Sequence, residues 1–170
     1  ASANAIEFTG GANQLILHAG SVIDGNVVST SGSTNGGDKL TLGGDVDANG
    51  GNTFDLALSG SSAQYRGFTK FSKEGISAWT VSGTGGASGH AWTVESGTLA
   101  LAEQTALTSA VSIQSGAELN AGNATINGNV TNIGLLSIGS SAAANTTLAI
   151  TGDYTQGAGG LLAISLSSAS

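Results

Sequence analysis

Residues 78–81 read Ala-Trp-Thr-Val, and the same four residues recur thirteen positions later, at residues 91–94. Each copy alternates small or polar with large apolar side chains and is followed by a glycine, Gly83 or Gly97. A short alternating strand that ends in a glycine turn and soon recurs is typical of a stacked solenoid, in which each repeat buries its apolar side only against its neighbours. The repeat therefore predicts a structural scaffold.

Apolar residues also alternate with polar ones in many other short runs. Three such triplets follow one another from Val111, Ala117 and Ala124, six or seven residues apart. Strands this short could form a sandwich, a barrel or a β-helix, but this spacing fits successive faces of one coil better than hairpins. We therefore expect an all-β, parallel β-helix with little or no α-helix. About 20 residues per coil, as in the longer solenoid repeats, would give roughly eight coils.

Composition restricts how such a chain is stabilised and what it binds. The 170 residues include no Cys, Pro or Met, so stability must come from packing and backbone hydrogen bonds rather than from disulfides or thiolate metal sites. Eleven acidic and four basic residues give a net charge of −7, which repels nucleic acid. No apolar run approaches the roughly 18 residues of a membrane helix, and no basic segment precedes an apolar segment at Ala1 in the pattern of a signal peptide. We expect a soluble chain.

One stretch of the chain carries a family resemblance. Residues 73–83 follow the pattern Lys-x-Gly-x-x-x-Trp-Thr-hydrophobic-x-Gly, and residues 94–99 follow hydrophobic-x-x-Gly-Thr-Leu. Together they resemble the passenger-associated repeat of bacterial type V autotransporters. Further on, residues 152–164 look like the last coils of such passengers, just before the translocator barrel. The likeness covers residues 65–166, whereas residues 1–64 match only in general β-helix style.

The resemblance implies a right-handed parallel β-helix, with stem coils over residues 1–64 and coils similar to the family's autochaperone region over residues 65–170. It implies a non-enzymatic passenger segment, secreted or held at the bacterial cell surface through the parent chain's outer-membrane barrel. The implied partners are that translocator β-barrel in cis and a host-cell surface or the extracellular matrix, which the passenger would bind as an adhesin. We expect a monomer with no cofactor and no nucleic-acid partner.

A passenger crosses the outer membrane unfolded, and a chain without Cys and Pro suits this route. Disulfides would obstruct passage, and prolyl isomerisation would slow folding outside the cell. Because the C-terminal coils emerge first, they could provide a surface on which later coils fold. We hypothesise that large aromatic side chains, each burying about 150–250 Å², form the folding nucleus. The alternative is that they are ordinary core residues. The residues of this hypothetical nucleus are Phe68, Phe71, Trp79, Trp92 and Tyr154.

One segment resembles the start of a calcium-binding loop. Asp45, Asp47 and Asn49 place oxygen atoms at alternate positions before Gly50. However, Leu56 stands where the bidentate glutamate belongs, and no helices flank the segment. We interpret it as a solvated turn, with calcium binding as the alternative.

The other candidate polar residues form no catalytic pattern. His18 and His90, the only histidines, lie 72 positions apart and lack any paired ligand spacing, so we interpret them as surface or coil-top residues. Arg66, Lys70 and Lys73 fall within eight positions. We interpret these three as a plain exposed edge, with docking of an acidic partner or of the barrel mouth as the alternative.

The competing function is a carbohydrate-binding or polysaccharide-processing β-helix. Such an enzyme needs paired carboxylates on one exposed face and an aromatic-lined groove. Asp45, Asp47 and Asp55 form the only local acidic group, with Phe54 as their nearby aromatic residue. We expect no catalytic residue and favour the non-enzymatic passenger segment.

Overall fold

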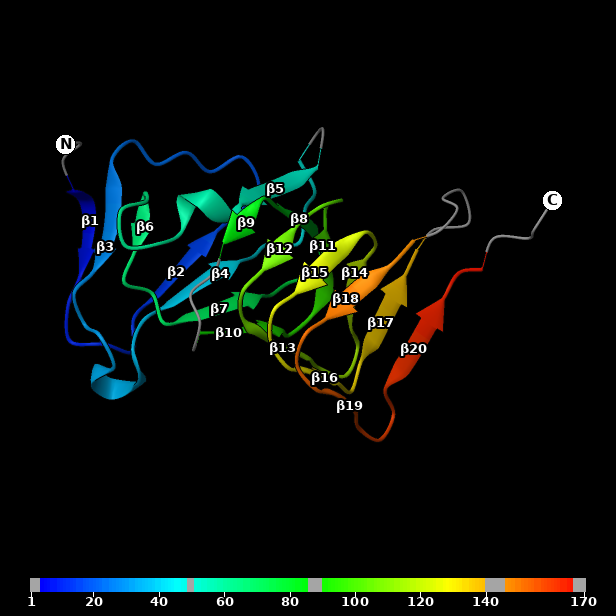
Figure 1. The fold of residues 1–170 in the computed structure, drawn as a ribbon. Coiled ribbons are helices and arrows are strands. Elements are labelled where there is room, and N and C mark those ends of the chain that lie inside the picture. Colours follow the sequence, from blue (N-terminus) through cyan, green and yellow to red (C-terminus); the bar gives the residue numbers. More distant parts are fainter. Residues whose placement is uncertain (1–3, 49–50, 86–89, 140–145, 167–170) are drawn as a thin grey trace.

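The computed structural model describes residues 4–48, 51–85, 90–139 and 146–166. The chain winds into an all-β solenoid of about seven turns, with parallel strands stacked from the N-terminal end to the C-terminal end (Figure 1). Apart from strands and turns, the described part contains only two 3₁₀ segments, η1 (Thr34–Gly36) and η2 (Leu56–Leu58). The parallel β-helix expected from the sequence is confirmed, with about seven coils rather than eight.

Within the described residues, the strands form parallel sheets of seven, six, four and three strands. The seven-stranded sheet contains, in spatial order, β19 (Tyr154–Gln156), β16 (Val130–Asn132), β13 (Ala110–Ile113), β10 (Ala91–Val94), β7 (Lys70–Lys73), β4 (Lys39–Leu42) and β2 (Gln14–Leu17). The six-stranded sheet contains β20 (Leu161–Ile164), β17 (Leu135–Ile138), β14 (Ala117–Ala121), β11 (Gly97–Leu101), β8 (Ala78–Ser82) and β5 (Asn52–Asp55).

The two smaller sheets each cover part of the stack. The four-stranded sheet contains β18 (Leu148–Ile150), β15 (Ala124–Ile126), β12 (Ala106–Leu107) and β9 (Thr84–Gly85). The three-stranded sheet contains β1 (Asn4–Phe8), β3 (Asn26–Ser29) and β6 (Tyr65–Arg66) at the N-terminal end. Figure 1 shows β1 and β3 in blue at one end of the molecule and β20 in red at the other.

The three consecutive apolar triplets lie on three different faces of one coil, as their spacing predicts. Val111 belongs to β13, Ala117 to β14 and Ala124 to β15, in the seven-, six- and four-stranded sheets respectively. Six or seven residues therefore carry the chain from one face of the solenoid to the next.

The core consists of ladders in which inward side chains of successive coils lie one over another. In the six-stranded sheet, Trp79, Leu99, Leu119 and Leu136 are in register, and none is more than 5% exposed. Neighbouring strands lie about 4.7–4.9 Å apart, so each side chain packs on the ones before and after it. The core of each coil is thus completed by its neighbours.

Coil length differs along the stack, which is why about seven coils form rather than eight. Leu40 pairs with Phe71, 31 positions later, whereas Trp92 pairs with Val111, only 19 positions later. The additional residues of the N-terminal coils form loops such as the one that contains η1. A uniform coil of about 20 residues describes only the middle of the chain.

Strand pairing is continuous across residues 64 and 65, where the sequence suggests a division of the chain. β3 pairs with β6, β4 with β7 and β5 with β8. The expected division into residues 1–64 and 65–170 falls inside one stack and stays a prediction about how the chain folds.

Asp38 is a fully buried carboxylate in the N-terminal coils. Its Oδ1 accepts hydrogen bonds from the backbone N–H (2.8 Å) and the side-chain amide (2.9 Å) of Asn13. Its Oδ2 accepts from the hydroxyls of Ser29 (2.7 Å) and Ser31 (2.8 Å). Burial alone would raise the pKa of Asp38, but these hydrogen bonds outweigh it, so the pKa lies below the ordinary 3.8. The fold therefore stabilises the charged form.

We predict that Asp38 makes the stability of the fold depend on acid pH. As pH falls, the Asp38 carboxylate is protonated near pH 3.8 in the unfolded chain and only at lower pH in the folded chain. The stability that Asp38 contributes is therefore lost as pH falls through its lower folded pKa. Asp38→Asn should cost about 1–3 kcal/mol near neutral pH, because donors lose their acceptor, and this difference should shrink in acid. Urea unfolding of the unaltered chain and of Asp38→Asn between about pH 6 and about pH 3 measures this difference in stability. A difference that is constant over this range would contradict the assignment.

Candidate functional site

Lys73 lies in the core at the end of β7, in register with Leu42 on one side and Val94 on the other. Its side chain is 0% exposed. The interpretation of Lys73 as part of an exposed edge is therefore wrong. Phe71 points inward from the same strand, and side chains two positions apart share one face, so the strand directs Lys73 inward as well. Lys70 is exposed, as expected.

The buried ammonium group of Lys73 is held by backbone carbonyls from two coils. Its Nζ donates hydrogen bonds to the carbonyl oxygens of Glu74 (2.9 Å), Gly75 (2.8 Å) and Ser96 (3.2 Å). Burial lowers the pKa of Lys73 below its ordinary value of 10.5, while nearby negative charges act in the opposite direction. The side chain therefore joins the turn after β7 to the turn before β11.

Two glycines provide the space that this arrangement needs. Gly75 has φ +76°, and a Cβ there would lie 2.2 Å from the carbonyl oxygen of Gly44. Gly97 has φ +66°, and a Cβ there would lie 2.4 Å from the Gly75 oxygen and 2.8 Å from Lys73 Nζ. Both positions require glycine for conformation and for space. We refer to Lys73, Gly75, Ser96 and Gly97 together as the Lys73 corner.

Asp45 and Asp47, the calcium candidates, bind backbone amides of the following coil. Asp45 Oδ1 accepts from the N–H of Ile76 (3.0 Å), and Asp47 Oδ1 accepts from the N–H of Ala78 (2.8 Å). Asn49, the third candidate, lies outside the described residues. Among the described residues, no three His, Asp or Glu side chains are grouped to hold a metal ion. The described contacts of Asp45 and Asp47 are those of turn-capping residues.

Direct ring contacts join only some of the proposed folding-nucleus residues. Phe71 and Trp92, on paired strands, stack with ring centroids 5.2 Å apart and an interplanar angle of 19°. Phe68 instead packs edge-on against Phe8, with centroids 5.8 Å apart. Tyr154 is separated from Trp92 by β13 and β16. Phe68, Phe71, Trp79 and Trp92 nevertheless belong to one hydrophobic core, against which Tyr154 packs, and the role of these five residues in folding stays a prediction.

Trp79 occupies a different face from Trp92, although both follow the same Ala-x-Thr-Val pattern. Trp79 belongs to the six-stranded sheet, and its indole Nε1 donates to the carbonyl oxygen of Gly43 (3.1 Å). The indole Nε1 of Trp92 is buried without a hydrogen-bond partner among the described residues. The two copies of the thirteen-residue repeat therefore form strands on two different faces of the solenoid, and these strands do not stack on each other.

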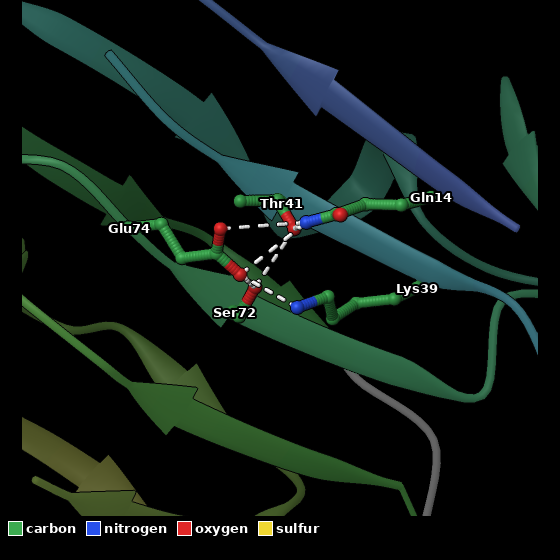
Figure 2. Close-up of polar contacts among 5 residues, drawn as sticks. All are labelled: Gln14, Lys39, Thr41, Ser72 and Glu74. Atoms are coloured by element: carbon green, nitrogen blue, oxygen red, sulfur yellow. Dashed lines mark hydrogen bonds and ion pairs between the residues drawn. The ribbon is translucent and has the colours of Figure 1, made fainter. Parts of the chain in front are cut away.

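A polar network covers the outer face of β2, β4 and β7 beside the Lys73 corner, and Figure 2 shows its five side chains converging. Glu74 accepts from Lys39 Nζ (2.6 Å), Ser72 Oγ (3.1 Å) and Gln14 Nε2 (3.3 Å), while the Thr41 and Ser72 hydroxyls lie 2.8 Å apart. Burial raises the pKa of Glu74, but the ammonium of Lys39 and the other donors outweigh it and hold the pKa below 4.5. We refer to these residues as the Glu74 network.

The sequence gives little indication of the Glu74 network, because Gln14 and Glu74 are 60 positions apart. Among its members, only the alternation within β4 and β7, which places Thr41 and Ser72 on the outer face, could have been anticipated. Their pairing partners depend on coil lengths that the sequence does not reveal.

An open groove of about 490 Å³ runs beside the Glu74 network across β2, β4, β7 and β10. Its polar lining includes the amides of Asn13 and Asn35, the ammonium groups of Lys39 and Lys70, and Glu95. Glu95 is the only carboxylate among the lining residues that the structure describes. The described lining residues therefore include one carboxylate, whereas a glycoside hydrolase uses a pair.

The residues noted for polysaccharide processing have other contacts. Asp55 Oδ1 accepts from the N–H of Ala57 at the start of η2 (2.9 Å). Phe54 is 3% exposed and packs against Tyr65, with ring centroids 5.8 Å apart. His90, interpreted as a surface or coil-top residue, is partly buried beside Phe71, whereas His18 is exposed.

Comparison with known proteins adds no support to the family resemblance seen in the sequence. No protein-family model, curated protein or solved structure matches this chain. In the described part of the chain, no helix is long and apolar enough to cross a membrane.

We predict that the Lys73 corner tolerates no side chain at Gly97. Gly97→Ala and its matched control Gly116→Ala both place alanine at positive φ, which costs about 1–2 kcal/mol, but a Cβ at Gly116 meets nothing within 4 Å. Gly97→Ala must also displace the ammonium of Lys73 and the Gly75 carbonyl. It should lower the free energy of unfolding by about 1–3 kcal/mol more than Gly116→Ala. Equal losses in urea unfolding would show that the corner is not tightly packed.

Proposed function

We propose that this chain is a non-enzymatic segment of a secreted autotransporter passenger, and that its C-terminal coils are the template on which the β-helix folds at the cell surface. The observation that carries this proposal is the Lys73 corner. The resemblance rests on two segments of sequence, residues 73–83 and 94–99, and in the folded chain Lys73 of the first reaches Ser96 and Gly97 of the second. Both segments of the pattern thus contribute residues to one structural feature, the Lys73 corner.

The contacts between the two halves of the chain support a template role. Ser72 and Glu74 belong to residues 65–170, whereas Gln14, Lys39 and Thr41 belong to residues 1–64. Ser72 and Glu74 also bond to each other on the same strand end (3.1 Å), so they can be in place before β4 arrives. A coil that adds to β7 would then find its hydrogen-bond partners already oriented, as strand-by-strand growth of a solenoid requires.

The location and partners that we propose follow from the same interpretation. The segment would be displayed at the bacterial cell surface or released from it, and the parent chain's outer-membrane barrel would be its partner in cis. The net charge of −7 disfavours nucleic acid as a partner. The outer face of the seven-stranded sheet presents hydroxyl side chains in register on successive coils, which suits contact with a host-cell surface or the extracellular matrix. These residues are Thr93, Ser112, Thr131 and Thr155, whereas Thr41 and Ser72 of the same ladder are 0% and 1% exposed and bond within the Glu74 network.

Carbohydrate binding is the second candidate function, and the groove beside the Glu74 network is the observation that favours it. Amide, hydroxyl and ammonium groups together can bind the hydroxyls of a sugar. The capping contacts of Asp45, Asp47 and Asp55 argue against processing of the bound sugar. Depletion of the protein by insoluble polysaccharides, with the products tested for new reducing ends, would separate binding from cleavage.

We predict that Trp92 takes part in the folding nucleus. Trp92→Ala should cost about 3–5 kcal/mol, and most of this loss should appear as slower refolding, roughly 100-fold or more, because the stack with Phe71 forms early. Trp92→Phe is the matched control, since it keeps an aromatic ring on Phe71 while it removes part of the ring volume and the indole N–H, which has no partner among the described residues. Stopped-flow refolding and unfolding rates measure how the loss of stability divides between slower refolding and faster unfolding. If Trp92→Ala only accelerates unfolding, Trp92 is an ordinary core residue.

A further inference from the structure

Asparagine followed by glycine is the dipeptide in which a side-chain amide most readily reacts with its own backbone. Glycine has no Cβ to stand between its nitrogen and the preceding side chain. The chain has three such pairs, at residues 35–36, 49–50 and 127–128, and the second lies outside the described residues. The other two lie in different connections of the solenoid, so their surroundings can be compared within one fold.

Asn127 and Gly128 lie in the short connection between β15 and β16. Asn127 is exposed, and its side chain forms no hydrogen bond with a described residue. The backbone N–H of Gly128 also has no acceptor in the described part of the chain. The side-chain amide can therefore turn toward the Gly128 nitrogen without breaking a hydrogen bond.

Stacking of the coils requires this asparagine to be followed by glycine. The N–H of Asn127 donates to the carbonyl oxygen of Leu107 in the preceding coil (2.8 Å), which fixes the backbone before the pair. A Cβ at Gly128 would lie 2.4 Å from the carbonyl oxygen of Ser109, so no other residue fits there without a shift of the backbone. The packing of the coils thus imposes the reactive dipeptide and leaves its two reacting groups unbonded.

Asn35 and Gly36 lie in η1, and there both reacting groups are bonded. Asn35 Nδ2 donates to the carbonyl oxygen of Gly10 (2.8 Å), and the N–H of Gly36 donates to the carbonyl oxygen of Ser33 (3.0 Å). Asn35 is exposed like Asn127, so exposure does not distinguish the two pairs. A reaction at Asn35 must first break two hydrogen bonds that stabilise the folded state.

We propose that Asn127 is a site of spontaneous deamidation in the folded chain, whereas Asn35 is protected until its turn opens. The Gly128 nitrogen gives its proton to water, and its electron pair forms a bond to Asn127 Cγ. The Cγ–Nδ2 bond breaks, and ammonia leaves with a proton taken from water. Water then opens the five-membered imide at either carbonyl carbon, which gives aspartate or isoaspartate. The only reactant besides the chain is water.

The reaction changes the solenoid at one defined place. Both products add a negative charge to the connection between β15 and β16. Isoaspartate also lengthens the main chain by one carbon atom, because the backbone then runs through Cβ and Cγ of residue 127. The inference concerns the chemistry of this turn and does not depend on the proposed function.

The test is the rate of deamidation at both asparagines in the folded 170-residue chain, incubated at mildly alkaline pH in water labelled with heavy oxygen. Mass spectrometry of peptides from the chain detects the label, so it counts only residues that reacted during the incubation, and fragmentation separates aspartate from isoaspartate. Asn127 should react roughly ten-fold faster than Asn35, or more, because two hydrogen bonds of ordinary net strength protect Asn35. In urea the two rates should be similar, since glycine follows both residues.

Asn127→Gln is the matched control. Its side chain would have to close a six-membered ring, so the label at residue 127 should disappear while the slow reaction at Asn35 stays unchanged. Two results would overturn the proposal. The first is a rate at Asn127 that is no higher than the rate at Asn35 in the folded chain. The second is a rate at Asn127 that rises on unfolding by as large a factor as the rate at Asn35, which would show that the fold protects both turns.

Discussion

The stacking of each inward side chain on its counterpart in the next coil supplies a hydrophobic core that no single coil of this protein possesses. Trp79, Leu99 and Leu119 lie in one ladder, and Phe71 and Trp92 lie in another. Neither disulfides nor dense ion pairing can replace these contacts, since the chain lacks cysteine and only 9% of its residues are charged. The parallel ladders and the proposed mode of folding both follow from this dependence of each coil on its neighbours.

Polar groups placed within the ladders give the stack a defined register. Lys73 and Asn132, both 0% exposed, lie in a ladder whose other buried members are apolar, namely Leu17, Leu42, Val94 and Ile113. Lys73 is satisfied by carbonyls of its own turn and of the next coil, and Asn132 Nδ2 donates to the carbonyl oxygen of Leu161 (2.9 Å). A coil that paired out of register would leave these groups buried without partners, which costs more than an apolar mismatch. The buried polar residues therefore select one stacking arrangement, while the apolar residues supply most of the energy.

The sequence predicts the period of this fold better than its long-range contacts. The triplets that begin at Val111, Ala117 and Ala124 give the faces of the coil, because alternation within a strand directly reflects burial. Loop length is not encoded in such a pattern, so the coil count and the partners of Glu74 could not be predicted. Because lysine is almost never fully buried, Lys73 was predicted to be exposed, and its place in the core was missed. The aromatic residues show the same limit, since spacing along the chain did not reveal that Trp79 and Trp92 lie on different faces.

Separate expression of residues 65–170 and residues 1–64 tests the dependence of one coil on the next most directly. Residues 65–170 contain the Lys73 corner, the Phe71–Trp92 stack and β6 to β20, whereas residues 1–64 contain only β1 to β5. About three repeats are needed to bury a continuous solenoid core. We expect residues 65–170 alone to show a β-type circular dichroism spectrum and cooperative urea unfolding, and residues 1–64 alone to stay unfolded until the longer piece is added. Independent folding of residues 1–64, or failure of residues 65–170 to fold, would contradict the account.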